Sequence, residues 1–289
     1  MASSSARAFR TALGPAVARR SPPQLARPSV SPLAAPLWTR NKMVNAESTG
    51  TVIQVGKQQH WTAFMYGRER QLLVHVVNSV EEGDVDGILQ AIDDFWGHHF
   101  HMKGADTWSV RKEVLDKTIS DKKPERCLEL GTYCGYSALR IARNLPENGK
   151  LVSMEIDPLF CAIATKIIEY AGLQDKVKVL TGTVETKMQR IQEVLAKPGE
   201  NVADVKVDFV LCDHSKDRFL PDLELLESSQ VVGAGTVVMG DTTPYPGEES
   251  ADDLDLLSHF VASNKFRIQQ HVGTEKTAGI TVCEWQHLV

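Results

Sequence analysis

The chain has 289 residues, of which 42% are hydrophobic, and its 32 basic and 37 acidic side chains give a formal net charge of −5. This length is enough for one large domain with extensions or for two small domains. No stretch approaches the roughly 18 to 20 uninterrupted apolar residues that cross a bilayer, so the sequence predicts a soluble globular protein without a membrane span.

Basic side chains are concentrated at the N-terminus. Residues 1–46 hold seven of the chain's 32 and no acid, so the rest of the chain carries 25 basic and 37 acidic side chains. This acidic body would repel a phosphate backbone, which argues against a nucleic-acid partner. Residues 1–46 are rich in Arg, Ser, Ala and Pro, which is typical of an organelle transit peptide and predicts mitochondrial localisation. The alternative is a disordered tail on a cytoplasmic protein, and in both cases residues 47–65 form a linker.

Helical spacing of apolar residues predicts three helices at 67–80, 85–96 and 107–119, with a loop over 97–106. After Pro124, short apolar strands alternate with helical segments. We expect strands at 126–130, 150–156, 176–182, 207–213, 235–241, 266–272 and 279–285. The helices that follow the first five strands are expected at 136–145, 158–172, 184–196, 216–229 and 250–263.

This alternation predicts an α/β fold in which a seven-stranded, mostly parallel sheet carries helices on both faces. No helix separates the last two strands, so they form a hairpin and one strand runs antiparallel. The main domain is expected to span 66–289, with N-terminal helices at 66–120 and a Rossmann-like core at 125–289. Ligands of such sheets bind beyond the carboxyl ends of the strands, near the topological switch point.

The first core strand ends in a glycine loop, "ELGTYCGYS". Gly131 and Gly135 allow the backbone to approach a ligand closely. Glu155 ends the second strand, where an acid commonly accepts ribose hydroxyls of an adenosine-containing cofactor. The glycine spacing departs from the dinucleotide fingerprint, and Glu129 suits a cationic sulfonium or ammonium better than a diphosphate. The loop therefore favours S-adenosylmethionine over NAD, and a tight turn around a buried acid is the alternative.

Two further strand ends carry acids that can hold a metal ion. Asp213 and Asp241 end strands that are expected to be neighbours, so their carboxylates can converge on one hard cation such as Mg²⁺. Lys216 follows Asp213 by about one helical turn and can face the same cleft. A lysine beside a divalent cation has its charged form disfavoured, which suits a general base. Taken alone, "DHSKD" can equally be an exposed Asp–Lys pair at a helix start.

The cysteines and a cluster of histidines are weaker candidates for a metal site. The five cysteines form no C-x-x-C pair and no zinc-finger spacing, which is typical of a reduced intracellular protein. His98, His99 and His101 lie close together, but no nearby Cys or acid has the spacing of a third ligand. We expect this cluster to shape the substrate entrance instead.

Several motifs in order, "LELGTYCGYSALRIA", "MEIDP", "DHSKDRFLPDLELLE" and "GDTTPYPG", resemble the successive motifs of the catechol O-methyltransferases. The resemblance runs from roughly residue 67 to the C-terminus. It implies a class I methyltransferase fold, S-adenosylmethionine, Mg²⁺ and transfer of a methyl group to one hydroxyl of a catechol.

The resemblance also implies a role for individual residues. Contacts to the cofactor are implied for Glu129, Gly131, Tyr133, Tyr136, Ser137, Glu155, Ile156, Gly182, Glu185, Asp213 and His214. The implied metal ligands are Asp213, Asp241 and Thr242, and the implied general base is Lys216. Substrate contacts are implied for Lys216, Thr242, Pro246 and Glu275.

The sequence departs from the family at several of these positions. Thr242 stands where the family usually has an asparagine metal ligand, and Ser215 stands where mammalian enzymes have a tryptophan against the adenine. Matching Glu275 to the second substrate-binding acid requires a short insertion. The aromatic wall of the catechol pocket falls on Phe100 or Trp108.

The expected reaction is a direct displacement, in which Lys216 removes the proton of a metal-bound hydroxyl and the oxygen attacks the sulfonium methyl. We expect a small-molecule substrate and a monomer. Three alternatives remain: a cation-dependent methyltransferase of larger phenolics such as caffeoyl-CoA, an NAD-dependent oxidoreductase, and a catalytically weakened binding module of the same fold, which Thr242 would favour.

Overall fold

A computed structural model of the chain describes residues 54–55, 58–59, 68–99, 105–241, 260, 263–272 and 279–286, all of which belong to the unit Thr51–Val289. Residues 1–46, with the predicted targeting segment, lie outside this set, as does most of the linker. The two short strands β1 (Gln54–Val55) and β2 (Gln58–Gln59) pair with each other as a separate antiparallel sheet.

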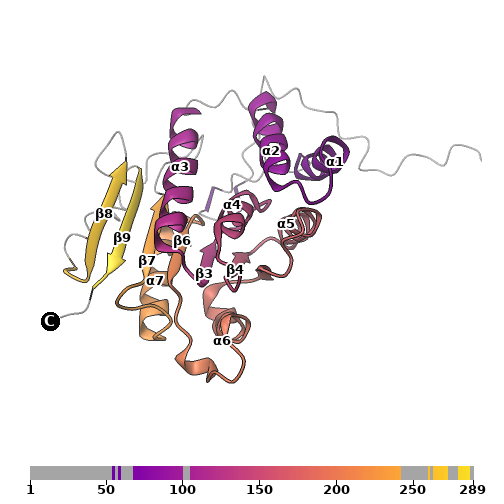
Figure 1. The fold of residues 1–289 in the computed structure, drawn as a ribbon. Helices are drawn as coiled ribbons and strands as arrows, with labels where there is room; N and C mark the ends of the chain where they lie inside the picture. Colours follow the sequence, from indigo (N-terminus) through magenta and orange to yellow (C-terminus); the bar gives the residue numbers. More distant parts are fainter. Residues whose placement is uncertain are drawn as a thin grey trace, which may run out of the picture. The chain divides into compact units, whose positions relative to one another are not determined.

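A seven-stranded sheet forms the centre of the domain (Figure 1). Its strands, in chain order, are β3 (Arg126–Leu130), β4 (Lys150–Glu155), β5 (Val177–Thr181), β6 (Phe209–Cys212), β7 (Val237–Asp241), β8 (Phe266–Val272) and β9 (Ile280–Trp285). They lie in the order β5-β4-β3-β6-β7-β9-β8, and β9 alone runs antiparallel to both of its neighbours. The predicted seven-stranded, mostly parallel sheet is confirmed. Because the chain builds outward from β3 to β5 and then returns to β6, the topological switch point lies between β3 and β6.

Helices cover both faces of this sheet, as predicted. The helices are α1 (Glu69–Ser79), α2 (Val85–His99), α3 (Ala105–Lys122), α4 (Tyr136–Asn144), α5 (Pro158–Tyr170), α6 (Val184–Leu195) and α7 (Phe219–Ser228). One apolar cluster joins α1–α5 to one face, and a second joins α6 and α7 to the other. Consecutive strand residues point to opposite faces, so Cys127 belongs to the first cluster and Leu128 to the second.

Local capping explains where several helices begin. Asp157 caps α5 by accepting from the backbone N–H groups of Leu159 and Phe160, and Pro158 occupies the first turn, where no N–H is needed. Thr183 and Thr186 form a capping box at the start of α6.

The largest differences from the predicted element boundaries lie in the helices. The helix predicted at 85–96 continues to His99, and the next begins at Ala105, because a glycine at 97 costs only about 1 kcal/mol in a helix. The segment predicted as one helix at 216–229 divides into a 3₁₀ turn at Lys216–Arg218 and α7. Most of the helix predicted at 250–263 lies outside the described residues. No helix in the described ranges is both long and apolar enough to cross a membrane.

Candidate functional site

The loops that follow β3 and β6 touch at the switch point. Gly131 has a φ of 96°, and a Cβ atom there would lie 2.4 Å from the backbone carbonyl oxygen of Asp213. The Asp213 amide donates to the carbonyl of Leu130 at 2.9 Å. Position 131 therefore requires glycine because the backbone of Asp213 lies so close to it, whereas the sequence suggested that a ligand approaches the loop there. The contact places the glycine loop and Asp213 side by side at the switch point.

Glu155 supports the glycine loop from the end of β4. Its Oε2 accepts the backbone N–H of Tyr133 at 2.7 Å, and its Oε1 accepts the N–H of Asp157 at 2.9 Å. Burial raises the pKa of Glu155, and these backbone donors oppose the rise. Each carboxylate oxygen has a second lone pair, so the residue can also accept hydroxyls from a ligand while it holds the loop.

Glu129 is fully buried at the end of β3. Ser153 donates to its Oε2, and the Thr132 hydroxyl is hydrogen-bonded to that of Ser153. Burial raises the pKa of Glu129 to about 7, although hydrogen bonds from the Ser137 and Ser153 hydroxyls oppose the rise. Its Oε1 has no partner of normal hydrogen-bond geometry among the described residues. A buried carboxylate with an unsatisfied oxygen suits a cationic ligand.

The two tyrosines of the loop hold it against neighbouring helices. The Tyr133 hydroxyl donates to Glu69 of α1 at 3.1 Å, and its ring packs edge-on against Phe160 of α5. The Tyr136 hydroxyl donates to Asp93 of α2 at 3.0 Å. Burial raises the pKa of both phenols, so both hydroxyls remain donors. Both tyrosines were expected to contact the cofactor, and this bracing role was not predicted.

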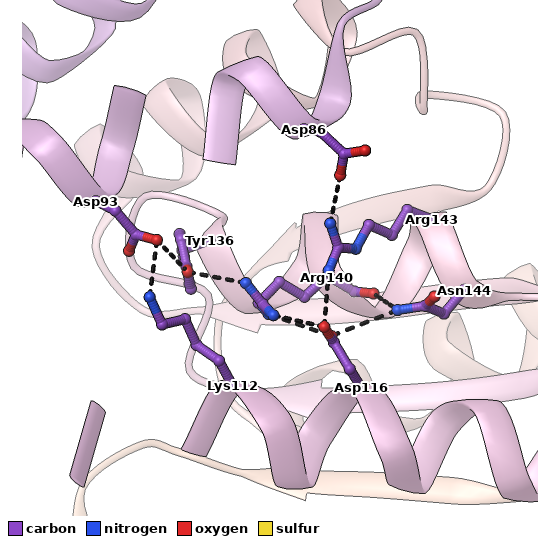
Figure 2. A network of polar contacts seen from close by, with 8 residues as sticks. All are labelled: Asp86, Asp93, Lys112, Asp116, Tyr136, Arg140, Arg143 and Asn144. Carbon is purple, nitrogen blue, oxygen red and sulfur yellow. Dashed lines mark hydrogen bonds and ion pairs between the residues drawn. The ribbon is translucent and has the colours of Figure 1, made fainter. Parts of the chain in front are cut away.

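Tyr136 is part of a polar network that joins α2, α3 and α4 (Figure 2). Its hydroxyl accepts from Arg140 at 3.0 Å, and Lys112 of α3 lies 2.8 Å from Asp93. Asp116 of α3 pairs with Arg140 and with Arg143, both on α4. The network fixes α3 against α4, directly beside the glycine loop.

Asp213 and Asp241 converge, as predicted from their strand ends. β6 and β7 are adjacent and parallel, with Cys212 opposite Gly240. The group found between the carboxylates is the guanidinium of Arg111, whose Nη2 is hydrogen-bonded to Asp213 Oδ2 and whose Nη1 lies 3.4 Å from Asp241 Oδ2. Burial raises the pKa of Asp213; the charge of Arg111 opposes this and that of Asp241 adds to it.

Arg111 was not among the predicted site residues, although the sequence contains a signal for it. Arg111 precedes Val114 and Leu115 by three and four residues, so all three lie on one face of α3. Val114 and Leu115 are buried in the core. An arginine on the apolar face of a helix indicates a buried acidic partner.

Lys216 lies on the 3₁₀ turn that follows Asp213 and is only 7% exposed. Its positive charge lowers the pKa of Asp213, which places the ammonium within electrostatic reach of that carboxylate. His214 is held by Asp222, with Nε2 3.1 Å from Oδ2, and its ring stacks on Phe219. Its Nδ1 is buried with no hydrogen-bond partner among the described residues. Lys216 therefore lies near Asp213 at the switch point, whereas the ring of His214 is anchored to α7.

Ile156 and Glu185 form an exposed rim at the ends of β4 and β5, next to Glu155. Ile156 is 72% exposed although it is apolar, and it directly follows Glu155. Gly182 donates its N–H to the Glu155 carbonyl at 2.8 Å, and Glu185 is exposed in the first turn of α6. The exposed Ile156 next to the Glu155 carboxylate offers an apolar surface beside an acid, which suits a nucleoside. Ser137, by contrast, is buried in the first turn of α4.

Other predicted site residues lie outside the described residues, namely Thr242, Pro246, Glu275, Phe100 and His101, together with the side chains of His98, His99 and Trp108. Within the described ranges, no three side chains of the His, Cys, Asp and Glu types are grouped to hold a metal ion. All five cysteines are free.

A family model of O-methyltransferases matches residues 110–270 of the chain. The chain is 35% identical over 201 residues to the catechol O-methyltransferase of Mus musculus, which covers 69% of this chain and 70% of that protein. It is 33% identical over 206 residues to the transmembrane O-methyltransferase of Homo sapiens, which covers 70% of this chain and 65% of that protein.

Solved structures show the same fold. An O-methyltransferase from Bacillus cereus in complex with SAH superposes with a TM-score of 0.52 at 22% identity, covering 74% of this chain and 95% of that one. The O-methyltransferase TomG from Streptomyces achromogenes in complex with SAM superposes with a TM-score of 0.50, also at 22% identity, covering 77% of this chain and all of that one.

Proposed function

Because the chain belongs to the O-methyltransferase family, we propose that it transfers the methyl group of S-adenosylmethionine to one hydroxyl of a catechol with the assistance of Mg²⁺. The observation that carries this proposal is the meeting of Asp213, Asp241 and the buried Lys216 beside the glycine loop. The similarity to catechol O-methyltransferases supports the substrate class. We place the activity in residues 66–289.

The carboxylates at the ends of β3 and β4 fit S-adenosylmethionine. Glu129 Oε1 is buried and has no partner of normal hydrogen-bond geometry in the described part of the chain, which suits the positive sulfonium or ammonium of this cofactor. Glu155 keeps lone pairs for ribose hydroxyls, and the exposed Ile156 beside it offers an apolar contact for the adenine.

The donor set at the ends of β6 and β7 fits a divalent cation. Asp213 and Asp241 would hold Mg²⁺, and their oxygens already converge on a positive group, the Arg111 guanidinium. We propose Thr242, the next residue, as a third oxygen ligand. Bound there, the ion would lower the pKa of a coordinated catechol hydroxyl.

We propose that Lys216 takes the proton of the reacting hydroxyl on Nζ. The oxygen then forms a bond to the methyl carbon while the bond from carbon to sulfur breaks, which leaves S-adenosylhomocysteine as a neutral thioether. Proton removal by a positioned base contributes about 10²- to 10⁴-fold to a rate. Pro246 and Glu275 are proposed to contact the catechol ring and its second hydroxyl.

A methyl-transfer assay tests this function directly. The protein is given S-adenosylmethionine with a labelled methyl group and either catechol or caffeoyl-CoA, in Mg²⁺ and in EDTA. We expect a labelled guaiacol-type product from catechol in Mg²⁺, little from caffeoyl-CoA, and loss of the product in EDTA. Transfer to caffeoyl-CoA alone would indicate a methyltransferase of larger phenolics, and no transfer to either would indicate a binding module.

A further inference from the structure

We propose that Arg111 is an internal counter-ion of the two site acids, which Mg²⁺ must displace in order to bind. The inference rests on the proposed magnesium site and concerns how that site exists without the metal. Asp213 and Asp241 end adjacent strands, and their side chains are only 15% and 9% exposed. Two buried carboxylates in proximity repel each other, and the Arg111 guanidinium, itself 12% exposed, offsets this repulsion.

Arginine and metal would compete for the same atoms. Arg111 contacts Oδ2 of Asp213 and Oδ2 of Asp241, which are oxygens that a shared divalent cation would use. A guanidinium left in contact with both would also face the positive metal at short range. Like charges at such a distance repel each other strongly in partly buried surroundings. Metal binding is therefore an exchange of one cation for another.

The exchange requires the side chain of Arg111 to move while its helix stays in place. Lys112 and Asp116 hold α3 to α2 and α4 through the network in Figure 2, with Lys112 Nζ 2.8 Å from Asp93 and Arg143 2.7 Å from Asp116. On the sheet side, Val114 and Leu115 anchor the same helix in the core. A long, flexible arginine side chain can rotate away without disturbing either contact.

This exchange has two consequences. When no metal is bound, the side chains of Asp213 and Asp241 keep their orientation, because the positive charge of Arg111 holds them in position. The apparent affinity for Mg²⁺ is lower than two convergent carboxylates would otherwise provide, because part of the binding free energy is used to displace Arg111.

The test compares Arg111→Met with two matched variants. Arg111→Met removes the charge at similar length, and Arg111→Lys keeps a charge without the planar fork. Arg143→Met is the control, because Arg143 also bridges two aspartates, Asp86 and Asp116, outside the site. Mn²⁺ serves as the probe, and its binding is measured by electron paramagnetic resonance without cofactor or catechol. Melting temperature is measured in EDTA and in Mg²⁺.

We expect Arg111→Met to bind Mn²⁺ about tenfold or more tightly than the wild type, with Arg111→Lys in between. Its melting temperature should fall by about 2 to 4 °C or more in EDTA and recover in Mg²⁺. Arg143→Met should lose stability equally in both buffers and keep the wild-type Mn²⁺ affinity. Equal or weaker Mn²⁺ binding by Arg111→Met would overturn the inference and leave the magnesium proposal standing. If neither the wild type nor Arg111→Met bound Mn²⁺, both would fail.

Discussion

Gly131 lies directly against the backbone of Asp213, so a Cβ atom at position 131 would meet the Asp213 carbonyl oxygen at 2.4 Å. The glycine loop on one side of the switch point and the candidate metal acid on the other are therefore in physical contact. A change at either residue is transmitted to the other because backbone, not a flexible side chain, fills the space.

Replacing Gly131 with alanine should disturb both halves of the site. The positive φ adds strain of roughly 1 to 3 kcal/mol, and the new methyl group must push Asp213 aside. We expect weaker binding of S-adenosylmethionine and of Mn²⁺ in calorimetric titrations. Gly172→Ala is the control, because Gly172 also has a positive φ but its Cβ would meet no atom within 4 Å. Equal loss of ligand binding in both variants would show that general destabilisation, not the Asp213 contact, is responsible.

Glu155→Ala should reduce both cofactor affinity and stability. A residue that only bound ribose would leave the melting temperature unchanged, but Glu155 also accepts the N–H groups of Tyr133 and Asp157. Losing hydrogen bonds to a charged group costs roughly 1.5 to 3 kcal/mol, so the affinity for S-adenosylmethionine should fall about tenfold or more. Calorimetry and thermal melting measure the two effects. A lower melting temperature with unchanged affinity would limit Glu155 to the bracing role.

Glu129 should make stability depend on pH. Burial raises its pKa from 4.5 to about 7 in the folded state. Between these values the folded state binds more protons than the unfolded state, so the free energy of unfolding falls as pH rises from about 4.5 to 7 and then levels off. The loss is about 3 kcal/mol, since each pH unit contributes about 1.4 kcal/mol.

The isosteric variant Glu129→Gln removes this titration. It should be more stable than the wild type at pH 8 and have a flatter profile in denaturant unfolding between pH 5 and pH 8. In the wild type, affinity for the cationic S-adenosylmethionine should rise as Glu129 ionises near pH 7, whereas in the variant it should be weaker and independent of pH. Parallel stability profiles would contradict the pKa shift.

Lys216→Met should strongly reduce turnover without lowering the affinity for S-adenosylmethionine. Lys216 is buried next to Asp213, and methionine preserves its volume while removing the base. We expect kcat to fall by about 10²-fold or more, and S-adenosylmethionine affinity by calorimetry to stay near the wild-type value. Lys216→Arg keeps the charge but cannot accept a proton at neutral pH. If Lys216→Arg retained full activity, the charge and not the base would be what the reaction needs.

Much of the fold follows from local pattern. Short apolar runs such as Arg126–Leu130, whose last four residues are all buried, and the helical spacing between these runs predict the order and type of elements. The structure confirms the sheet and its one antiparallel strand. The absence of a helix between β8 and β9 predicts their hairpin. Because parallel strands present their carboxyl ends on one edge, the sequence also predicts that Asp213 and Asp241 converge.

Partners of individual side chains could be known only from the tertiary structure. Arg111 meets Asp213 across 102 residues of sequence, and Tyr133 meets Glu69 across 64. Periodicity identifies which face of an element is buried, but the packing of α3 over the strand ends decides which charge lies between the two acids. The packing of α1 and α2 beside the glycine loop likewise decides that Tyr133 meets Glu69 and that Tyr136 meets Asp93. Local sequence patterns are therefore enough to locate the chemical groups along the edge of the sheet. What each group touches depends on how the helices pack against that edge, because this packing is set by contacts among residues that are distant in sequence.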